Sequence, residues 1–179
     1  EKNFLNINGE KSSGKSHLVN IFLKKFNGIR IDVNSLNDEN IKSIKPYQNI
    51  VLEDLNLNIN EKLIYSLFNI IDQDNKFLIV TSMKPISEIN FKLEDLRSRT
   101  KNCLFANIQN PDDELMFALI LKNLSDRQIT LDKKLINFII KRIERSYGKI
   151  FEFIYKIDKI SLKKKKSIDF KIINEALEE

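Results

Sequence analysis

The sequence is poor in cysteine, histidine and glycine, and the first two shortages each exclude a class of site. The single cysteine, Cys103, excludes an internal disulfide and any zinc site built from cysteines. Cys103 begins the apolar segment 103–106, where we expect a buried, unreactive thiol. The only histidine, His17, gives no basis for a histidine-dependent catalytic triad or metal cluster.

Long apolar runs are also missing, since none reaches the ~18 residues that a membrane-spanning helix needs. No secretory signal peptide is recognisable, and the chain begins without methionine, so we expect a further segment before Glu1. A hydrophobic content of 42% is nevertheless enough for a packed core. By elimination, we expect a cytoplasmic protein without a membrane partner.

Basic residues are in slight excess and give a formal net charge of +5. The most basic run is Lys163-Lys164-Lys165-Lys166, between two apolar helical segments. A solvated loop joining the two helices is the favoured interpretation, and contact with nucleic acid is the alternative.

Two of the four glycines belong to one motif, which fits the phosphate-binding P-loop pattern G-x-x-x-x-G-K-[ST] at every fixed position. The candidate nucleotide-binding residues are those of the motif and the histidine after it: Gly9, Glu10, Lys11, Ser12, Ser13, Gly14, Lys15, Ser16 and His17. A strand precedes the motif and a helix follows it, which is the geometry that lets backbone N–H groups cradle phosphates. We expect ADP or ATP here, with Lys15 on the β- and γ-phosphates and Ser16 on Mg²⁺.

Residues 1–110 alternate short apolar strands with helical segments, which predicts a five-stranded parallel sheet flanked by helices, an α/β fold. The expected strands are 3–8, 29–33, 49–53, 76–81 and 103–107. The expected helices are 15–26, 36–43, 61–73 and 92–99. In such sheets, ligands bind at the carboxyl ends of the strands, where the P-loop falls.

The pattern changes at Pro111, which suits the first turn of a helix, and the acidic pair after it suits the positive end of that helix. Residues 111–179 predict four helices, the first with an apolar stripe through Leu115, Ala118, Leu119 and Leu121–Leu124. A P-loop domain over 1–110 followed by a small all-α lid domain is the arrangement of AAA+ nucleotide-binding modules.

Segment 49–55 runs from apolar residues into two carboxylates, Glu53 and Asp54. A P-loop protein needs an acid at the end of a buried strand, so Glu53 is the candidate for the Mg²⁺ shell. Asp54 is the candidate for orienting an attacking water. The following strand ends in Thr81 and Ser82, and we expect it between the P-loop strand and the acidic strand. One of these hydroxyls could then approach the γ-phosphate, although hydroxyls at strand ends are equally common in turns.

Arg97 and Arg99 follow the acidic start of a predicted helix. Either could be a trans-acting arginine finger, which stabilises charge on the γ-phosphate held by a neighbouring subunit. From spacing alone, surface salt bridges to Glu94 or Asp95 are the favoured interpretation.

Together these motifs resemble the DnaA/Hda branch of AAA+ proteins over nearly the whole chain, most of all the Hda-type regulators of alphaproteobacteria (HdaA). The resembling segments are Gly-x4-Gly-Lys-Ser-His-Leu, Glu53-Asp54, Thr81-Ser82, Leu93-Glu94-Asp95-Leu96-Arg97-Ser98-Arg99, Asp126-Arg127-Gln128 and Arg142-Ile143-Glu144-Arg145-Ser146. The resemblance implies a regulator that binds ADP or ATP, associates with the DNA-loaded sliding clamp and promotes hydrolysis of ATP bound to DnaA. The family's finger falls on Arg99, which the resemblance therefore favours as functional.

The sequence departs from this family in four places. The clamp-binding peptide would precede Glu1, and Met83 stands where the initiator branch carries an acidic residue. The lid arginine of the initiator aligns near Gly148, with Lys149 as the nearest cation, which argues for weak or no intrinsic ATPase activity. We expect no DNA-binding domain after the lid, which would count against the initiator itself.

Three other interpretations stay open. The first is an ATP-hydrolysing helicase loader like DnaC, with Glu53 and Asp54 as catalytic residues. The second is a truncated DnaA initiator, and the third is a P-loop scaffold whose nucleotide is structural. The third is disfavoured because Lys15 and Ser16 are both retained. Because a trans-acting finger needs a partner subunit, we expect some hetero-association, and the resemblance implies DnaA as that partner. Homo-oligomer formation is an option, and we expect DNA to be contacted only indirectly.

Overall fold

The computed structural model describes residues 2–56 and 59–178. Contacts divide the chain into two compact units, Glu1–Gln109 and Asn110–Glu179, and each unit is described by itself.

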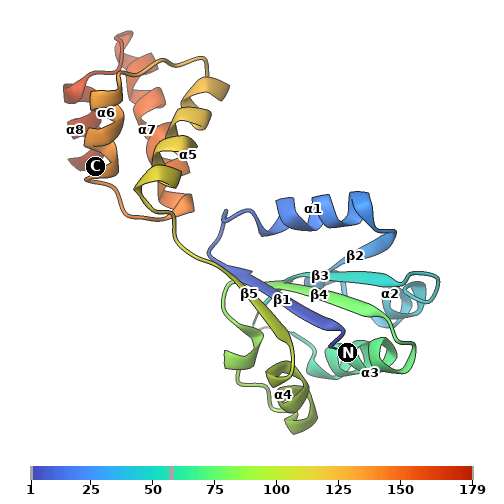
Figure 1. Cartoon of the computed structure of the whole chain (residues 1–179). Coiled ribbons are helices and arrows are strands. Elements are labelled where there is room, and N and C mark those ends of the chain that lie inside the picture. Colours follow the sequence, from blue (N-terminus) through green and yellow to red (C-terminus); the bar gives the residue numbers. More distant parts are fainter. Residues whose placement is uncertain (1, 57–58, 179) are drawn as a thin grey trace. The chain divides into compact units, whose positions relative to one another are not determined.

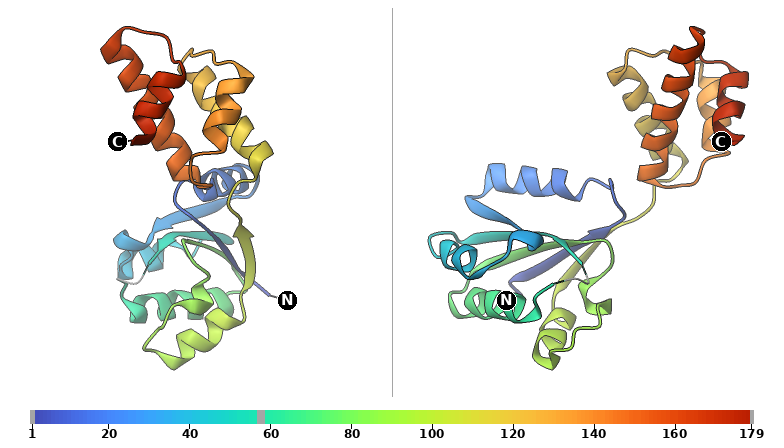
Figure 2. Two further views of the ribbon diagram at one scale, coloured as in Figure 1. Left: turned by 90° about the vertical axis from the view of Figure 1, so that its left-hand side faces the viewer. Right: turned by 180° about the vertical axis from the view of Figure 1, so that it is seen from behind.

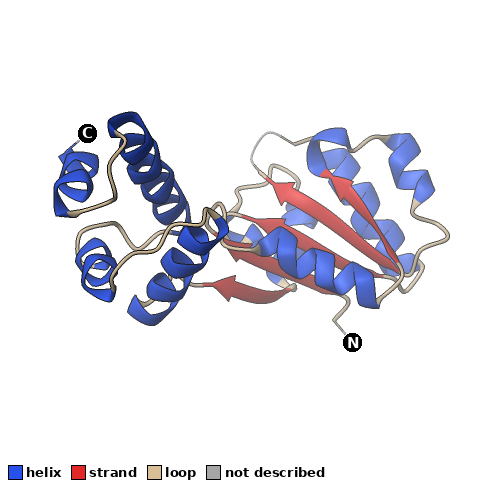
Figure 3. Ribbon diagram, turned by 90° about the horizontal axis from the view of Figure 1, so that it is seen from above, coloured by secondary structure: helices blue, strands red, loops and turns tan. Residues whose placement is uncertain are grey.

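The first unit is a five-stranded parallel sheet with helices on its faces, as the sequence predicted. Its strands are β1 (Phe4–Gly9), β2 (Gly28–Asp32), β3 (Asn49–Leu55), β4 (Phe77–Ser82) and β5 (Leu104–Ile108). Its α-helices are α1 (Lys15–Lys25), α2 (Asp38–Ser43), α3 (Glu61–Gln73) and α4 (Glu94–Lys101), with short 3-10 turns η1 (Val33–Ser35) and η2 (Ile86–Glu88). Figure 3 shows the strands running in one direction.

The order of the strands brings the predicted site segments together. The order is β2-β3-β4-β1-β5, so β4 lies between the P-loop strand β1 and the acidic strand β3, as predicted. The carboxyl ends of these three neighbouring strands therefore meet at one edge of the sheet. The two acids and the two hydroxyls therefore lie at the edge of the sheet where the P-loop begins.

Two apolar clusters hold the layers together, one on each face of the sheet. On one face, Val19 of α1 packs with Ile7, Val51 and Ile79. On the other face, α3 contributes four buried residues at helical spacing, namely Ile64, Leu67, Phe68 and Ile71. Figure 1 shows the result, with α1 on one side of the sheet and α3 and α4 on the other.

Strand β5 forms an edge of the sheet and is less buried than the sequence suggested. Leu104 and Phe105 are 47% and 43% exposed. Cys103 is buried as expected, but it precedes the strand rather than beginning it. Burial raises the pKa of its thiol to about 11, which fits an unreactive group.

The second unit is all helical and has the four predicted helices. They are α5 (Asp113–Asp126), α6 (Lys133–Ile140), α7 (Tyr147–Lys164) and α8 (Phe170–Glu178), and Figure 2 shows them in two views, coloured from yellow to red. The predicted stripe on α5 included the buried Leu124, but it was otherwise wrong in phase, because Met116 and Ile120 are buried while Leu115 is 41% exposed. Segment 115–121 is apolar throughout, so its periodicity does not define one face.

The lysine run lies partly in a helix, which corrects the loop interpretation. Lys163 and Lys164 form the last turn of α7, and Lys165 ends the helix with a left-handed φ of 54°. Lys164 forms an ion pair with Glu175 of α8. Over the part of the chain that the structure describes, no helix combines the length and apolar character needed to cross a membrane.

Candidate nucleotide-binding site

The P-loop joins β1 to α1 in a tight turn that depends on its two glycines. A β-carbon on Gly9 would lie 2.8 Å from Ser13 Oγ and 3.0 Å from Ile108 Cβ, so this position has no room for a side chain. Gly14 has a φ of 92° and stands as the N-cap of α1 without a side-chain cap. The amides in the first turn of α1 lack acceptors within the helix, which makes this end suitable for an anion.

Lys15 is folded onto its own loop. Its Nζ donates to the carbonyl oxygens of Gly9 and Glu10, each at 2.8 Å, and the residue is 7% exposed. Burial lowers the pKa of Lys15, and the carboxylates of Asp54 and Glu10 partly oppose that shift. A buried ammonium that donates to two neutral carbonyl oxygens is well placed to exchange them for a phosphate group.

The other motif residues surround this lysine. Ser13 is buried, and its Oγ has no hydrogen-bond partner within the described residues, which leaves a polar atom free for a ligand. Ser16 and His17 lie exposed in the first turn of α1, and Lys11 and Ser12 are exposed in the loop. The donor set of the loop therefore fits the phosphates of a nucleotide.

The two acids of β3 point to different surroundings. Glu53 Oε2 lies 3.3 Å from Arg30 Nε of β2, while Oε1 is buried and has no hydrogen-bond partner among the residues that the structure covers. Asp54 is exposed and has a left-handed φ of 58°, in the region where the pairing of β3 with β4 shifts register. The Asp54 N–H donates to Thr81 Oγ1 at 3.0 Å, which joins the acid to the end of β4.

Thr81 and Ser82 are buried and belong to the sheet's own hydrogen-bond network. The Ser82 hydroxyl donates to the Lys84 carbonyl at 2.6 Å and accepts from Asn6 Nδ2 at 2.9 Å. Sequence reasoning missed Asn6, a fully buried residue of β1 whose Oδ1 also accepts the Ile86 N–H at 3.0 Å. Its signal was the alternation of Asn6 and Asn8 with the apolar residues Leu5 and Ile7 in the strand.

A magnesium site would rest on few protein ligands. The described residues contain no group of three or more His, Cys, Asp or Glu side chains suited to a metal ion. The unpartnered Oε1 of Glu53 and the exposed hydroxyl of Ser16 are nevertheless oxygen donors of the kind that Mg²⁺ prefers. Nucleotide-bound Mg²⁺ commonly has only one or two protein ligands, so these residues fit it.

Arg99 lies on α4, far from its own P-loop. It forms an ion pair with Asp72 at the end of α3, and its guanidinium lies 5.6 Å from the ring centre of Tyr65. Asp72 also accepts from Asn3 Nδ2 at 3.3 Å, so this cluster lies near the amino end of β1. The P-loop follows the carboxyl end of the same six-residue strand, about 20 Å away.

The salt bridges expected from spacing are not those observed. Arg99 pairs with Asp72 rather than with Glu94 or Asp95. Arg97 donates through Nη2 and Nε to the carbonyl oxygen of Phe91, at 2.9 and 3.3 Å. Asp72 and the Phe91 carbonyl both lie outside α4, so a rule based on spacing within that helix does not find them.

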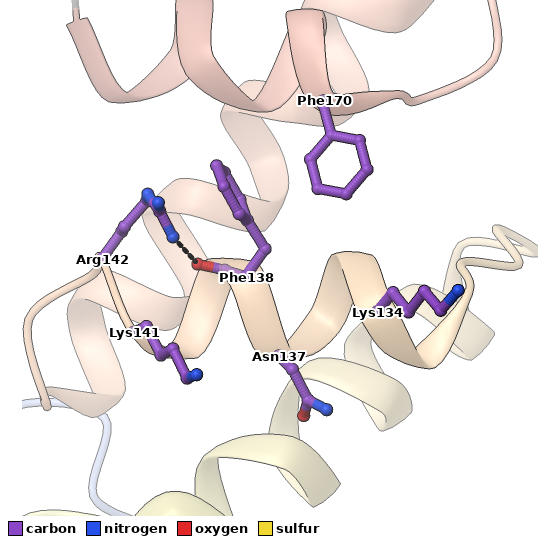
Figure 4. Close-up of a pocket in the computed structure, with 6 residues that line it drawn as sticks. All are labelled: Lys134, Asn137, Phe138, Lys141, Arg142 and Phe170. Atoms are coloured by element: carbon purple, nitrogen blue, oxygen red, sulfur yellow. Dashed lines mark hydrogen bonds between the residues drawn. The ribbon is translucent and has the colours of Figure 1, made fainter.

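The lid unit carries an aromatic cleft of about 410 Å³ that the sequence did not predict. Figure 4 shows Phe138 of α6 between Arg142, which follows that helix, and Phe170 of α8, and the guanidinium of Arg142 lies 3.5 Å from the ring centre of Phe138. Elsewhere in this unit, Lys149 donates to Glu152 at 2.9 Å, which raises the pKa of Lys149. Lys149 is thus engaged within its own helix, beside Gly148.

Comparisons with known proteins agree with this geometry. Residues 112–177 match the family model described as "Hda, lid domain". A chromosomal replication initiator protein DnaA from Lachnoclostridium phytofermentans is 30% identical over 64% of this chain and 25% of its own length. These matches support a relationship of this chain to the DnaA/Hda branch of AAA+ proteins.

Other relatives extend the similarity over the whole chain. An uncharacterised Haemophilus influenzae protein is 25% identical over 97% of this chain and 81% of its own length. Domain III of Thermotoga maritima DnaA has the same fold, with a TM-score of 0.78, 18% identity and coverage of 99% and 84%. A replication initiator DnaA bound to AMPPCP and single-stranded DNA has a TM-score of 0.70 at 18% identity, covering 91% of this chain and 59% of that one. This AAA+ chain spans less than half the length of the DnaA relatives that it matches.

Proposed function

We propose that this AAA+ chain is a nucleotide-binding regulator of chromosomal replication initiation, which promotes hydrolysis of the ATP bound to DnaA. The observation that carries the proposal is the separation of Arg99 from its own P-loop by the length of β1. A guanidinium at that distance cannot reach the nucleotide of its own chain. It can act only on a nucleotide held by another molecule.

The P-loop of this chain would hold ADP or ATP. The backbone N–H groups of residues 9–16 would donate to the phosphates, and Lys15 would exchange two loop carbonyls for phosphate oxygens. Ser16 and Glu53 would hold Mg²⁺, which neutralises phosphate charge when it is bound. Asp54 would orient a water, and its backbone is fixed for this by Thr81.

Arg99 would complete the active site of DnaA by stabilising the charge that develops on its γ-phosphate. The ion pair with Asp72 and the ring of Tyr65 would hold the guanidinium in position before the partner arrives. Its side chain is 30% exposed, so one side of the guanidinium stays available to a partner. Intrinsic ATPase activity would be weak, because Gly148 stands where the initiator has its lid arginine.

This function implies partners besides DnaA. By analogy with Hda-type regulators, the sliding clamp would recruit the protein through a segment before Glu1. Contact with DNA would then be indirect, and the protein would work in the cytoplasm. The protein could also form homo-oligomers.

The test is single-turnover hydrolysis of labelled ATP preloaded on the cognate DnaA, with clamp-loaded DNA and the full-length protein. The wild type should accelerate hydrolysis, and Arg99→Ala should remove that acceleration, since a finger contributes about 10³–10⁵ in rate. Nucleotide binding by the Arg99→Ala variant should remain unchanged, whereas Lys15→Ala should abolish it.

Asp72→Asn is the matched control, because it breaks the same ion pair but keeps the guanidinium. It should retain most of the acceleration, whereas a purely structural role for Arg99 would make both variants equally inactive. Absence of acceleration by the wild type, together with turnover raised by single-stranded DNA, would instead support the helicase-loader interpretation.

A further inference from the structure

A basic residue that the motifs do not include stands beside the candidate metal ligand. Arg30 is in the middle of β2, next to the acidic strand β3. Its Nε lies 3.3 Å from Glu53 Oε2, and its Nη2 donates to Asn20 Oδ1 of α1. Arg30 therefore bridges the P-loop helix and the acidic strand.

Glu53 lies on the face of the sheet that α1 covers. Val51, two residues earlier on β3, packs with Val19 of α1, and side chains two apart on a strand share a face. The Glu53 side chain is only 12% exposed. One of its oxygens is paired with Arg30 and the other has no hydrogen-bond partner within 2–56 and 59–178. One oxygen of the carboxylate is thus engaged by the Arg30 guanidinium, and the other remains available to a ligand.

We propose that Arg30 is a built-in counter-ion of Glu53 that competes with Mg²⁺ and makes nucleotide binding by this chain nearly independent of the metal. This inference rests on the proposed nucleotide-binding function and assigns a role to a residue outside the P-loop and the acidic motif.

The physical reason is the charge already present at the carboxylate. A divalent cation near Oε1 meets a carboxylate whose other oxygen already contacts Arg30, and it lies within several ångströms of a guanidinium that repels it. Arg30 cannot move away without losing its bond to Asn20. Phosphate binding therefore depends mainly on Lys15 and the loop amides.

The test measures the dissociation constant of a fluorescent ATP analogue in Mg²⁺ and in EDTA, for the full-length protein. The quantity compared is the dissociation constant in EDTA divided by the dissociation constant in Mg²⁺. This ratio reports how strongly the metal promotes binding, and it does not depend on hydrolysis. The wild type should give a ratio within about threefold of one. Arg30→Gln should raise the ratio about tenfold, because the carboxylate becomes free for the metal.

Three further variants keep the result specific. Asn20→Ala removes only the anchor of Arg30 and should raise the ratio by a smaller factor. Lys24→Gln removes a positive charge elsewhere on α1 and should leave the ratio unchanged. Glu53→Gln in the Arg30→Gln background should return the ratio to its wild-type value.

The outcomes separate this inference from the function on which it rests. A ratio for Arg30→Gln equal to or below that of the wild type, with binding intact, would overturn the role of Arg30 alone. Failure of the wild type to bind the nucleotide under either condition would overturn the proposed function and this inference with it.

Discussion

Replacing Asn6 with leucine should destabilise the first unit strongly, although the two side chains are similar in size. Asn6 is fully buried in β1 and makes three hydrogen bonds. Its Nδ2 donates to the Val80 carbonyl at 3.0 Å and to Ser82 Oγ at 2.9 Å. Its Oδ1 accepts the Ile86 N–H at 3.0 Å, which fixes the chain after β4.

The magnitude follows from these partners. Three neutral hydrogen bonds at about 1 kcal/mol each give about 3 kcal/mol. The Ile86 N–H would also be left buried without this acceptor, and such groups cost about 1–3 kcal/mol. Part of this is offset because leucine is easier to bury than an amide. We therefore expect a net loss of about 3 kcal/mol in the free energy of unfolding.

Asn8→Leu is the matched control on the same strand. Asn8 is 3% exposed, its Nδ2 donates once, to Asn107 Oδ1 at 2.8 Å, and its own Oδ1 has no partner among the described residues. Leucine removes that unsatisfied oxygen, so we expect a cost below about 1 kcal/mol. Urea denaturation of both variants, followed by circular dichroism, measures the difference. Equal costs for the two substitutions would refute the argument from hydrogen-bond partners.

Two further predictions concern other parts of the fold. Because the pKa of the Cys103 thiol is raised from 9.0 to about 11, the folded state keeps a proton that the unfolded state loses. Stability should therefore fall as pH rises from about 9 to about 11, and the fall should be smaller in Cys103→Ala when urea midpoints are compared. Gly28→Ala should destabilise by about 1–3 kcal/mol, because its β-carbon would lie 2.5 Å from the Asn49 carbonyl oxygen of β3. Gly148→Ala should instead stabilise by about 0.5–1 kcal/mol in thermal unfolding, since its nearest neighbour would be Ser146 Oγ at 3.7 Å.

The strands of the sheet could be predicted from the sequence because each has a recognisable pattern within a few residues. The P-loop glycines, the apolar run into Glu53 and the hydroxyls after residues 77–80 each carried a signal within a few residues. The place of β4 between β1 and β3 then followed from the regularities of P-loop folds. The phase of α5 failed for the opposite reason, since seven consecutive apolar residues hold no information about which side is buried.

The contacts that shape the candidate site were not predictable in this way. Arg30 meets Glu53, and Arg99 meets Asp72, only after the fold has formed. The left-handed backbone of Asp54 also depends on the register shift between β3 and β4. Such contacts join residues more than 20 positions apart, and short-range spacing rules do not reach them.

The residues for nucleotide binding and for action on a partner lie at opposite ends of β1. The P-loop continues from the carboxyl end of β1, whereas the Arg99–Asp72 pair lies beside Asn3 at its amino end. Loss of Lys15 should therefore abolish nucleotide binding without moving Arg99. Loss of Arg99 should leave that binding intact. A self-contained ATPase would also lose nucleotide binding with Lys15, so the distinguishing effect is that loss of Arg99 removes the acceleration of hydrolysis on DnaA while binding by this chain stays intact. The separation of these two effects in variants is what distinguishes a regulator acting in trans from a self-contained ATPase.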